Sequence, residues 1–234
     1  MCGRITQVSP PDQLSLLSVS LVEDVWGNDR RARYNGAPGQ KHWVLRQHPE
    51  TGRRSLDRLV WGLIPHGMQD GQGGPKPINA MAETVATKPM FRDAFRRRRC
   101  VLPVDSFFEW RRPSGQGPRQ PFAVGRRDGR AFGLAAIWEN WKNPKSGDWT
   151  RTFAVITCPA NDLVARIHNR MPVILGDDSL ERWLSPAEVD PGDLTVPFPS
   201  AELRVWRVSG RVNNVADDDP AVLEPPDEMV EYGG

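Results

Sequence analysis

The chain has 234 residues, 38% of them hydrophobic and 26% charged, with a formal net charge of +2, a balance typical of a soluble protein of one large domain or two small ones. No apolar run is long enough to span a membrane, and the first residues lack the hydrophobic stretch of a signal peptide, so we expect a cytoplasmic protein with no membrane partner. The 22 Pro and 21 Gly residues predict many turns and short elements, which argues against a helix bundle.

Short apolar runs and turn residues predict the following elements in chain order. The N-terminal half contains strands at residues 3–7, 42–47 and 57–61, a helix at 11–17, a mobile Gly-rich loop at 69–76 and a helix at 90–98. Next come strands at 99–104 and 107–111, a hairpin connection at 113–118, and strands at 122–125, 132–138 and 152–157. Helices at 161–167, with Asn161 as N-cap, and at 179–184 precede a last strand at 203–208. Many strands with few short helices predict an α+β domain around a curled, barrel-like and mostly antiparallel sheet.

The charge is unevenly distributed along the chain. Residues 217–234 contain seven acidic and no basic residues, which leaves 31 basic against 22 acidic residues, a net charge of +9, for residues 1–216. A folded body with this excess favours a polyanionic partner, and a merely solvated surface is the alternative. We expect one domain over residues 1–216 and an acidic, disordered tail over residues 217–234, where prolines are frequent.

Three cysteines, Cys2, Cys100 and Cys158, cannot all pair with one another, and none is spaced with histidine as in a zinc site. We therefore expect a reducing compartment, no metal and no cofactor. Cys2 follows only Met1, and its small size allows the methionine to be removed. The new terminus would carry an α-amine, with a reference pKa of about 8, beside a thiol on the adjacent carbon. Such a pair condenses with an aldehyde to an imine and then a thiazolidine; an ordinary buried cysteine is the alternative.

Polar residues in four other segments are candidates for a site: Asn35, Asn79, Glu109 and His168. Glu109 stands inside an aromatic run, so it either faces water from a strand or occupies an apolar pocket. In the pocket its proton affinity would rise, as a general acid–base requires. His168 follows a predicted helix and is either a site residue or a capping residue at the surface.

Arginines offer two further candidates. Arg170 precedes Met171-Pro172 and either contacts phosphate or pairs with an acid. The run Arg96-Arg97-Arg98-Arg99 forms either a phosphate-facing patch or a solvated helix end that the helix dipole favours.

Several motifs occur in an order that resembles the SRAP family, the SOS-response-associated peptidases. The matching segments span residues 1 to about 213 and are Met1-Cys2-Gly3-Arg4, Tyr34-Asn35-Gly36-Ala37-Pro38, Trp61-Gly62-Leu63-Ile64-Pro65, Asn79-Ala80 with Ala82-Glu83-Thr84, Met90-Phe91, Arg99-Cys100-Val101-Leu102-Pro103, Phe107-Phe108-Glu109-Trp110, Thr157 with Ala160-Asn161, His168 with Arg170-Met171-Pro172-Val173, and Val208-Ser209 with Val212-Asn213. The set is specific because an N-terminal cysteine must coincide with all the others in order.

The resemblance implies a single SRAP domain that senses abasic sites in single-stranded DNA and links to them covalently. It implies that Cys2, after removal of Met1, forms a thiazolidine with the aldehyde of the opened sugar. Glu109 would be the general acid–base and would also serve removal of Met1, Asn79 would hold the reacting centre, and His168 would assist ring opening or reversal. We expect a monomer associated with the nucleoid or with replication, with single-stranded DNA as its partner.

The resemblance also implies DNA contacts, which should be largely independent of base sequence. Arg4, Asn35 and Arg170 would hold flanking phosphates and sugar, and Met90 would contribute beside the lesion.

Three positions depart from the family pattern. Met81 stands where the family usually has an arginine that contacts the DNA backbone. His66-Gly67-Met68 follows Pro65 where the family often has a stacking tryptophan, and Asn169 replaces the more usual aspartate beside His168. Loss of that negative charge should lower the proton affinity of the imidazole.

Two other functions remain open from the sequence alone. A class II glutamine amidotransferase also begins Met-Cys-Gly, and its mature cysteine attacks an amide. A noncovalent single-strand-binding module, in which Cys2 is structural, is the second alternative.

Overall fold

The structure is a computed structural model that describes residues 2–9, 32–48, 50–68, 74–113, 117–188 and 190–226. Its strands are β1 (Ile5–Gln7), β2 (Arg33–Gly36), β3 (Lys41–Gln47), β4 (Arg54–Trp61), β5 (Asn79–Met81), β6 (Arg99–Val104), β7 (Ser106–Arg111), β8 (Gln120–Arg126), β9 (Phe132–Lys142), β10 (Trp149–Pro159), β11 (Arg170–Pro172), β12 (Ile174–Leu175) and β13 (Leu203–Arg207). The α-helices are α1 (Ala82–Val85), α2 (Arg92–Arg97) and α3 (Asp177–Leu184). The 3₁₀ helices are η2 (Val164–Arg166), η3 (Gly192–Leu194), η4 (Ser200–Glu202), η5 (Gly210–Asn213) and η6 (Pro220–Leu223).

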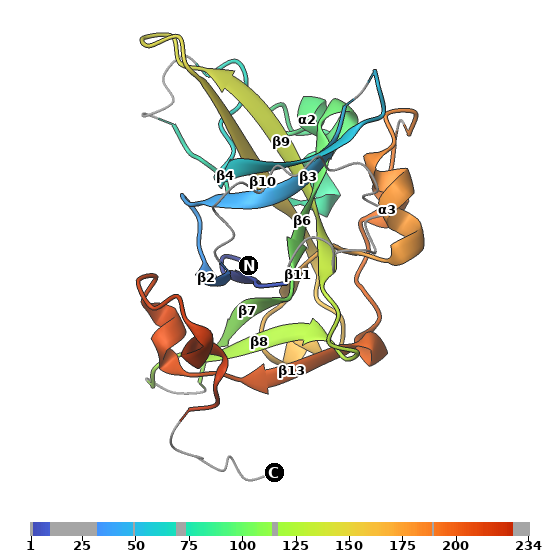
Figure 1. The fold of residues 1–234 in the computed structure, drawn as a ribbon. Helices are drawn as coiled ribbons and strands as arrows, with labels where there is room; N and C mark the ends of the chain where they lie inside the picture. Colours follow the sequence, from blue (N-terminus) through green and yellow to red (C-terminus); the bar gives the residue numbers. More distant parts are fainter. Residues whose placement is uncertain are drawn as a thin grey trace.

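The larger sheet closes on itself. Strands β10, β4, β3, β6 and β9 follow one another around a ring, which the long antiparallel pairing of β9 with β10 completes. The pairs β10–β4 and β10–β5 are parallel, and the other pairs recorded in this sheet are antiparallel. Closure removes the exposed edges that an open sheet would present. The predicted barrel-like, mostly antiparallel α+β fold is therefore confirmed, with α2 and α3 beside the barrel (Figure 1).

Alternating aromatic side chains fill the barrel. The rings of Trp61 on β4 and Phe153 on β10 stack with centroids 5.9 Å apart, and both are almost completely buried. The ring of His42 on β3 meets both of them edge-on. The indole N–H of Trp61 donates to the Ile78 carbonyl at 2.8 Å, which ties this core to the residue before β5. Core packing thus sets the position of the strand that begins at Asn79.

The second sheet has the strand order β13-β8-β7-β1-β2 and lies below the barrel in Figure 1. The chain passes from one sheet to the other between β6 and β7, at Asp105. The carboxylate of Asp105 accepts from the backbone N–H groups of Val8 at 2.6 Å and Ser9 at 3.0 Å, so it also fixes the end of β1. β1 pairs with β7 and β2 within this sheet, and Cys2 just before it accepts a hydrogen bond from Asn79 on β5 of the larger sheet, so the start of the chain contacts both sheets.

Most predicted elements are present. Each of the nine predicted strands overlaps an observed one, whereas the short strands β2, β5, β11 and β12 and helix α1 were not predicted. The helices predicted at 90–98 and 179–184 are α2 and α3, and the one at 161–167 is only the 3₁₀ turn η2. The Asn161 side chain accepts from the N–H of Val164 at 2.9 Å, as expected of a cap. The predicted helix at 11–17 and residues 69–73 of the predicted loop lie outside the described residues.

The expected disordered tail from residue 217 is wrong for residues 217–226. Pro220–Leu223 form η6, and Val222 is completely buried in a small cluster with Phe108. The carboxylate of Asp218 accepts from the backbone N–H groups of Tyr34 at 2.7 Å and Asn35 at 2.8 Å. The Asp218 side chain thus satisfies two backbone donors of β2 and is not merely solvated, so the segment belongs to the domain. Residues 227–234 lie outside the described residues.

No helix in the described part of the chain has the length and apolar character needed to cross a membrane.

Candidate active site and nucleic-acid interface

Strand β1 brings the start of the chain to the middle of the second sheet. Ile5 pairs with Phe107, and the Arg4 carbonyl accepts from the N–H of Phe108 at 3.0 Å. Continuing this antiparallel register toward the terminus leads to Glu109 on β7. Cys2 is fully buried, and burial followed by the nearby Glu109 charge raises the pKa of its thiol well above the usual range. The resting thiol is therefore neutral, which matches the alternative of a buried cysteine without excluding a reactive terminus.

Asn79 reaches the same place from the barrel. It is the first residue of β5, which runs parallel to β10. Its Nδ2 donates to the Cys2 carbonyl at 2.8 Å, so it holds the terminal residue directly. Its Oδ1 is buried and has no hydrogen-bond partner among the described residues. A buried amide oxygen without a partner is costly, which makes this atom a ready acceptor for a bound reactant.

Glu109 occupies the pocket and not the solvent-facing position. Its side chain is 2% exposed, because β7 is an inner strand between β1 and β8. Burial raises the pKa of this carboxyl to about 7, and the positive amino terminus of the chain and the Trp110 N–H act in the opposite direction. The sequence left two positions open for Glu109, and the structure places it in the buried one. A carboxyl that titrates near 7 can both accept and release a proton at neutral pH.

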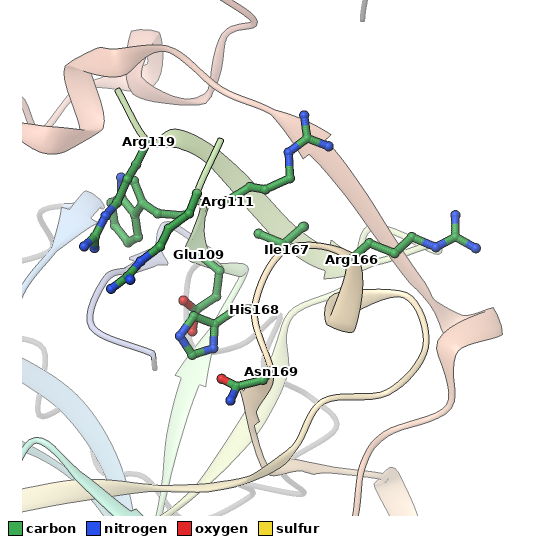
Figure 2. A pocket seen from close by; sticks show the side chains of 9 residues that line it. Glu109, Arg111, Arg119, Arg166, Ile167, His168 and Asn169 are labelled. Atoms are coloured by element: carbon green, nitrogen blue, oxygen red, sulfur yellow. The ribbon is translucent and has the colours of Figure 1, made fainter. Parts of the chain in front are cut away.

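His168 lies just before β11 and faces the same pocket as Glu109 (Figure 2). Its Nδ1 lies 3.0 Å from the backbone nitrogen of Arg170 and 3.2 Å from the Arg170 carbonyl oxygen, so the tautomer decides whether this ring nitrogen accepts or donates. Burial lowers the pKa of His168, and the charges of the amino terminus, Arg112 and Arg119 lower it further. The expected effect of Asn169, relative to an aspartate at that position, stays a prediction.

A cavity of about 570 Å³ opens beside Glu109 and His168. Four of the nine residues that line it are arginines, Arg111, Arg112, Arg119 and Arg166. In Figure 2, Arg119 and Arg166 lie on opposite sides of Glu109 and His168. The sequence analysis did not single out these arginines. A usable signal was present in the sequence, because Arg111 and Arg112 follow Glu109 after one residue, Trp110. The structure then pairs Arg111 with Gln120, the neighbour of Arg119.

The run Arg96–Arg99 does not form the single patch considered from the sequence. Arg99 is buried and donates to backbone carbonyls, including that of Trp183 at 2.7 Å. Arg98 pairs with Glu139 at 2.7 Å. Only Arg96 and Arg97 are exposed, on helix α2. Two of the four side chains therefore serve the fold.

Arg4 and Asn35 are bound to each other. Arg4 Nη1 donates to Asn35 Oδ1 at 2.7 Å and to the Val212 carbonyl at 2.6 Å. Asn35 is fully buried, and its amide also donates to the carbonyls of Asn214 at 2.9 Å and Asp217 at 2.8 Å. Any contribution of Asn35 to DNA binding is therefore indirect, through the position of Arg4; a direct phosphate contact of Arg4 remains a prediction.

Arg170 and Met90 lie on the barrel side of the site. Both terminal nitrogens of Arg170 donate to the Glu83 carboxylate, Nη2 at 2.9 Å, and Nη2 also donates to the Thr157 carbonyl at 2.6 Å. Arg170 is thus paired with an acid, the second of the two expected alternatives. Met90 is half-buried against the core. Contacts of these two residues with DNA remain predictions.

In the described part of the chain, no cluster of three or more His, Cys, Asp or Glu side chains could hold a metal ion. Four candidate residues come from two sheets: Cys2 before β1, Asn79 on β5, Glu109 on β7 and His168 before β11.

The sequence matches a known protein family, and the fold matches a solved structure. A family model described as SOS response associated peptidase (SRAP) matches residues 1–215. The abasic site processing protein YoqW of Bacillus subtilis (strain 168) is 34% identical over 227 residues, covering 96% of this chain and 99% of its own. The abasic site processing protein YedK of Escherichia coli (strain K12) is 31% identical over 232 residues, covering 96% and 100%. A solved structure of a Bacteroides thetaiotaomicron protein superimposes with a TM-score of 0.84 at 21% identity, covering 96% of this chain and 99% of that one, which supports the fold.

Proposed function

Because the chain belongs to the SRAP family, we propose that it processes abasic sites in DNA, as the names of its relatives YoqW and YedK state of those proteins. In finer detail, we propose that it binds single-stranded DNA, removes its own Met1 and forms a covalent thiazolidine with the lesion through Cys2. The observation that carries this proposal is the meeting of Cys2, Asn79 and Glu109: the asparagine holds the Cys2 carbonyl at 2.8 Å, and the pKa of the buried carboxyl is raised to about 7.

The reaction has three stages: removal of Met1, formation of an imine, and closure of the thiazolidine ring. Hydrolysis of the Met1–Cys2 peptide bond consumes one water and exposes the α-amine of Cys2. The amine adds to C1′ of the ring-opened sugar, and the resulting carbinolamine loses one water to form an imine. The thiol then adds across the imine, so that sulfur bonds to C1′ and its proton moves to nitrogen. The neutral thiol of buried Cys2 suits this order, because the amine and not a thiolate attacks first.

Glu109 transfers the protons in this sequence. It accepts a proton from the attacking amine and returns one to the hydroxyl that leaves the carbinolamine. A group whose pKa is raised to about 7 is partly in each form at neutral pH, which suits both tasks. Its burial beside Cys2 also suits activation of water for removal of Met1.

His168 assists opening of the sugar ring, and Asn79 positions the reacting groups. His168 donates a proton through Nε2 toward the ring oxygen as the furanose opens, in the tautomer whose Nδ1 accepts from the Arg170 N–H. Asn79 presents its free Oδ1 to the reacting centre and holds Cys2 in place with Nδ2. Positioning of this kind supplies several kcal/mol without extreme pKa shifts.

An amidotransferase-like reaction, in which Cys2 would be the first nucleophile on an amide, is tested by a glutaminase assay of the purified protein, and activity there would contradict our proposal. A noncovalent DNA-binding module is distinguished from our proposal only by experiment. We propose that the protein acts as a monomer near replicating DNA.

The decisive test is a denaturing gel of the purified protein with a single-stranded oligonucleotide that bears one abasic site. We expect a slower-migrating covalent species with the natural chain and none with Cys2→Ala, because the substitution removes the thiol that closes the ring. Cys158→Ala serves as a matched control that removes a different buried thiol. Free oligonucleotide in every lane after denaturation would refute the covalent mechanism and leave noncovalent binding.

Met81 offers a test of the DNA path. Its side chain is 42% exposed at the end of β5, two residues after Asn79. Met81→Arg should strengthen binding of undamaged single-stranded DNA and steepen the plot of log K against log salt by about 0.7, the value for one added phosphate contact. Fluorescence anisotropy at several salt concentrations measures both quantities. Met81→Gln is the neutral control, and equal slopes for the two variants would mean that this position does not face the DNA backbone.

A further inference from the structure

The arginine-lined cavity contains positively charged side chains that have no role in the proposed chemistry. Of its nine lining residues, four are arginines, and Glu109 alone is acidic. Arg112, Arg119 and Arg166 are exposed, and no described carboxylate pairs with any of the three. Elsewhere in the described chain arginines commonly meet carboxylates, as in the pairs Arg98–Glu139 and Arg33–Asp218. Like charges gathered at one cavity without a counter-charge are typical of a site for an anion.

The three arginines come from two separate elements. Arg112 directly follows β7, Arg119 directly precedes β8, and Arg166 is the last residue of η2. The cavity therefore has arginines on two sides of Glu109 and His168, as Arg119 and Arg166 show in Figure 2. Planar guanidinium groups bind phosphate oxygens through paired N–H donors, and arginines on two sides suit successive phosphates of a strand.

The cavity wall also contains apolar surface suited to a nucleotide. Trp110 lines it, and its indole N–H donates to Asn213 Oδ1 at 2.7 Å, which fixes the orientation of the ring. Ile167 lines the side next to Arg166. A volume of about 570 Å³ exceeds what a lone phosphate needs. An aromatic wall with cationic side chains is the combination that single-stranded nucleic acids use.

We propose that Arg112, Arg119 and Arg166 form a subsite for backbone phosphates of the damaged strand on one side of the abasic sugar. This subsite rests on the proposed function, because it places the lesion at Glu109 and His168. It assigns to the strand a path over the β7–β8 hairpin and η2, apart from the path beside Met81 and Arg170. The subsite therefore determines on which side of the lesion the protein requires a nucleotide.

The first experiment measures noncovalent binding of an undamaged single-stranded oligonucleotide by fluorescence anisotropy as salt is varied. The double variant Arg112→Gln/Arg119→Gln should lower the salt slope by about 1.4, and Arg166→Gln by about 0.7, since each lost single-strand phosphate contact changes it by about 0.7. The matched control is Arg96→Gln/Arg97→Gln, which removes two exposed charges from α2. If the two double variants had equal salt slopes, the effect would depend only on the overall charge of the protein, and the subsite would be overturned. Unchanged thermal unfolding confirms that each variant is folded.

The second experiment locates the phosphates. Rates of covalent capture are compared for three oligonucleotides, with the lesion internal, at the 5′ end, or at the 3′ end. The Arg112→Gln/Arg119→Gln defect should persist with the internal lesion and disappear for one of the two terminal lesions, which lacks the phosphates that the subsite binds. A defect of the same size on all three substrates would contradict a local subsite. Absence of capture by the natural chain would refute the proposed covalent function instead, and the anisotropy result would still decide the subsite.

Discussion

Glu109→Gln is expected to slow covalent capture of an abasic oligonucleotide by about 10²–10⁴-fold, the usual contribution of a general acid–base. The amide has nearly the shape of the carboxyl but transfers no proton. The same change should leave Met1 attached in a larger fraction of molecules, which intact mass spectrometry detects. Single-turnover capture on a denaturing gel gives the rate, with molecules that have lost Met1 compared separately. Normal processing together with a normal rate would exclude Glu109 as the proton-transfer group.

The pH dependence gives this prediction a second readout. Burial raises the pKa of Glu109 from 4.5 to about 7, so the carboxylate that accepts the amine proton forms only as the pH rises through 7. The capture rate of the natural chain should therefore rise across that range. In Glu109→Gln the capture rate should no longer rise with pH across this range. If the rise persisted, another titratable group would be responsible for it.

The same substitution should stabilise the folded protein at alkaline pH. Because the folded pKa lies above the unfolded one, the folded state binds more protons between these values, and stability falls as the pH rises from 4.5 to about 7. The full effect is on the order of 3 kcal/mol above pH 7. Glu109→Gln should remove this loss, so its melting temperature should exceed that of the natural chain at pH 8 and approach it at pH 5. A variant that was simply misfolded would lose both stability and activity.

Arg99→Met is expected to destabilise the protein by roughly 3–5 kcal/mol, the cost of breaking a buried charge–hydrogen-bond network. All five N–H donors of Arg99 are used, by backbone carbonyls at the ends of α2 and α3 and just beyond. The acceptors are the carbonyls of Phe95, Arg96, Trp183, Ser185 and Glu188. Carbonyls at helix C-termini have no partners within the helix and attract a cation.

The matched control is Arg97→Met, two residues earlier on the exposed side of α2. It should change stability by no more than about 0.5 kcal/mol. Thermal or urea unfolding measures both variants, with about 2–4 °C expected for each kcal/mol in a domain of this size. Similar small shifts for the two would show that the carbonyls find water instead, and that Arg99 is not required by the fold.

The strands were predictable because their signal is local. In β9 and β10 the apolar residues that fill the barrel follow one another in the sequence, and a strand places them by its own geometry. The strands that escaped prediction have two to four residues, as β5 and β12 do, and are too short to carry a pattern. Their pairing depends on β10 and β9, which already stand in the barrel.

Part of the site was also predictable. Cys2, Asn79, Glu109 and His168 were identified because motifs in a fixed order resemble one family, and the structure brings Asn79 to Cys2 and lines one cavity with Glu109 and His168. The environment of Glu109 was undecided between water and an apolar pocket. The alternation of side chains along a strand predicts which face Glu109 points to, but not whether other residues cover that face. Here both faces of β7 are covered, since Phe107 and Phe108 point to opposite faces and are both buried.

The sequence by itself determined the mostly antiparallel α+β architecture, the family and the four residues that carry the proposed chemistry. The tertiary structure alone decided the partners of the arginines. Arg99 donates to carbonyls of two helices and Arg170 pairs with Glu83, whereas Arg112, Arg119 and Arg166 line one cavity and pair with no carboxylate among the described residues. An arginine has the same local signature in each case. Its role depends on groups far away in the chain, as in the contact of Arg99 with the Trp183 carbonyl 84 positions later, and only closure of the barrel and packing of its helices bring such groups together.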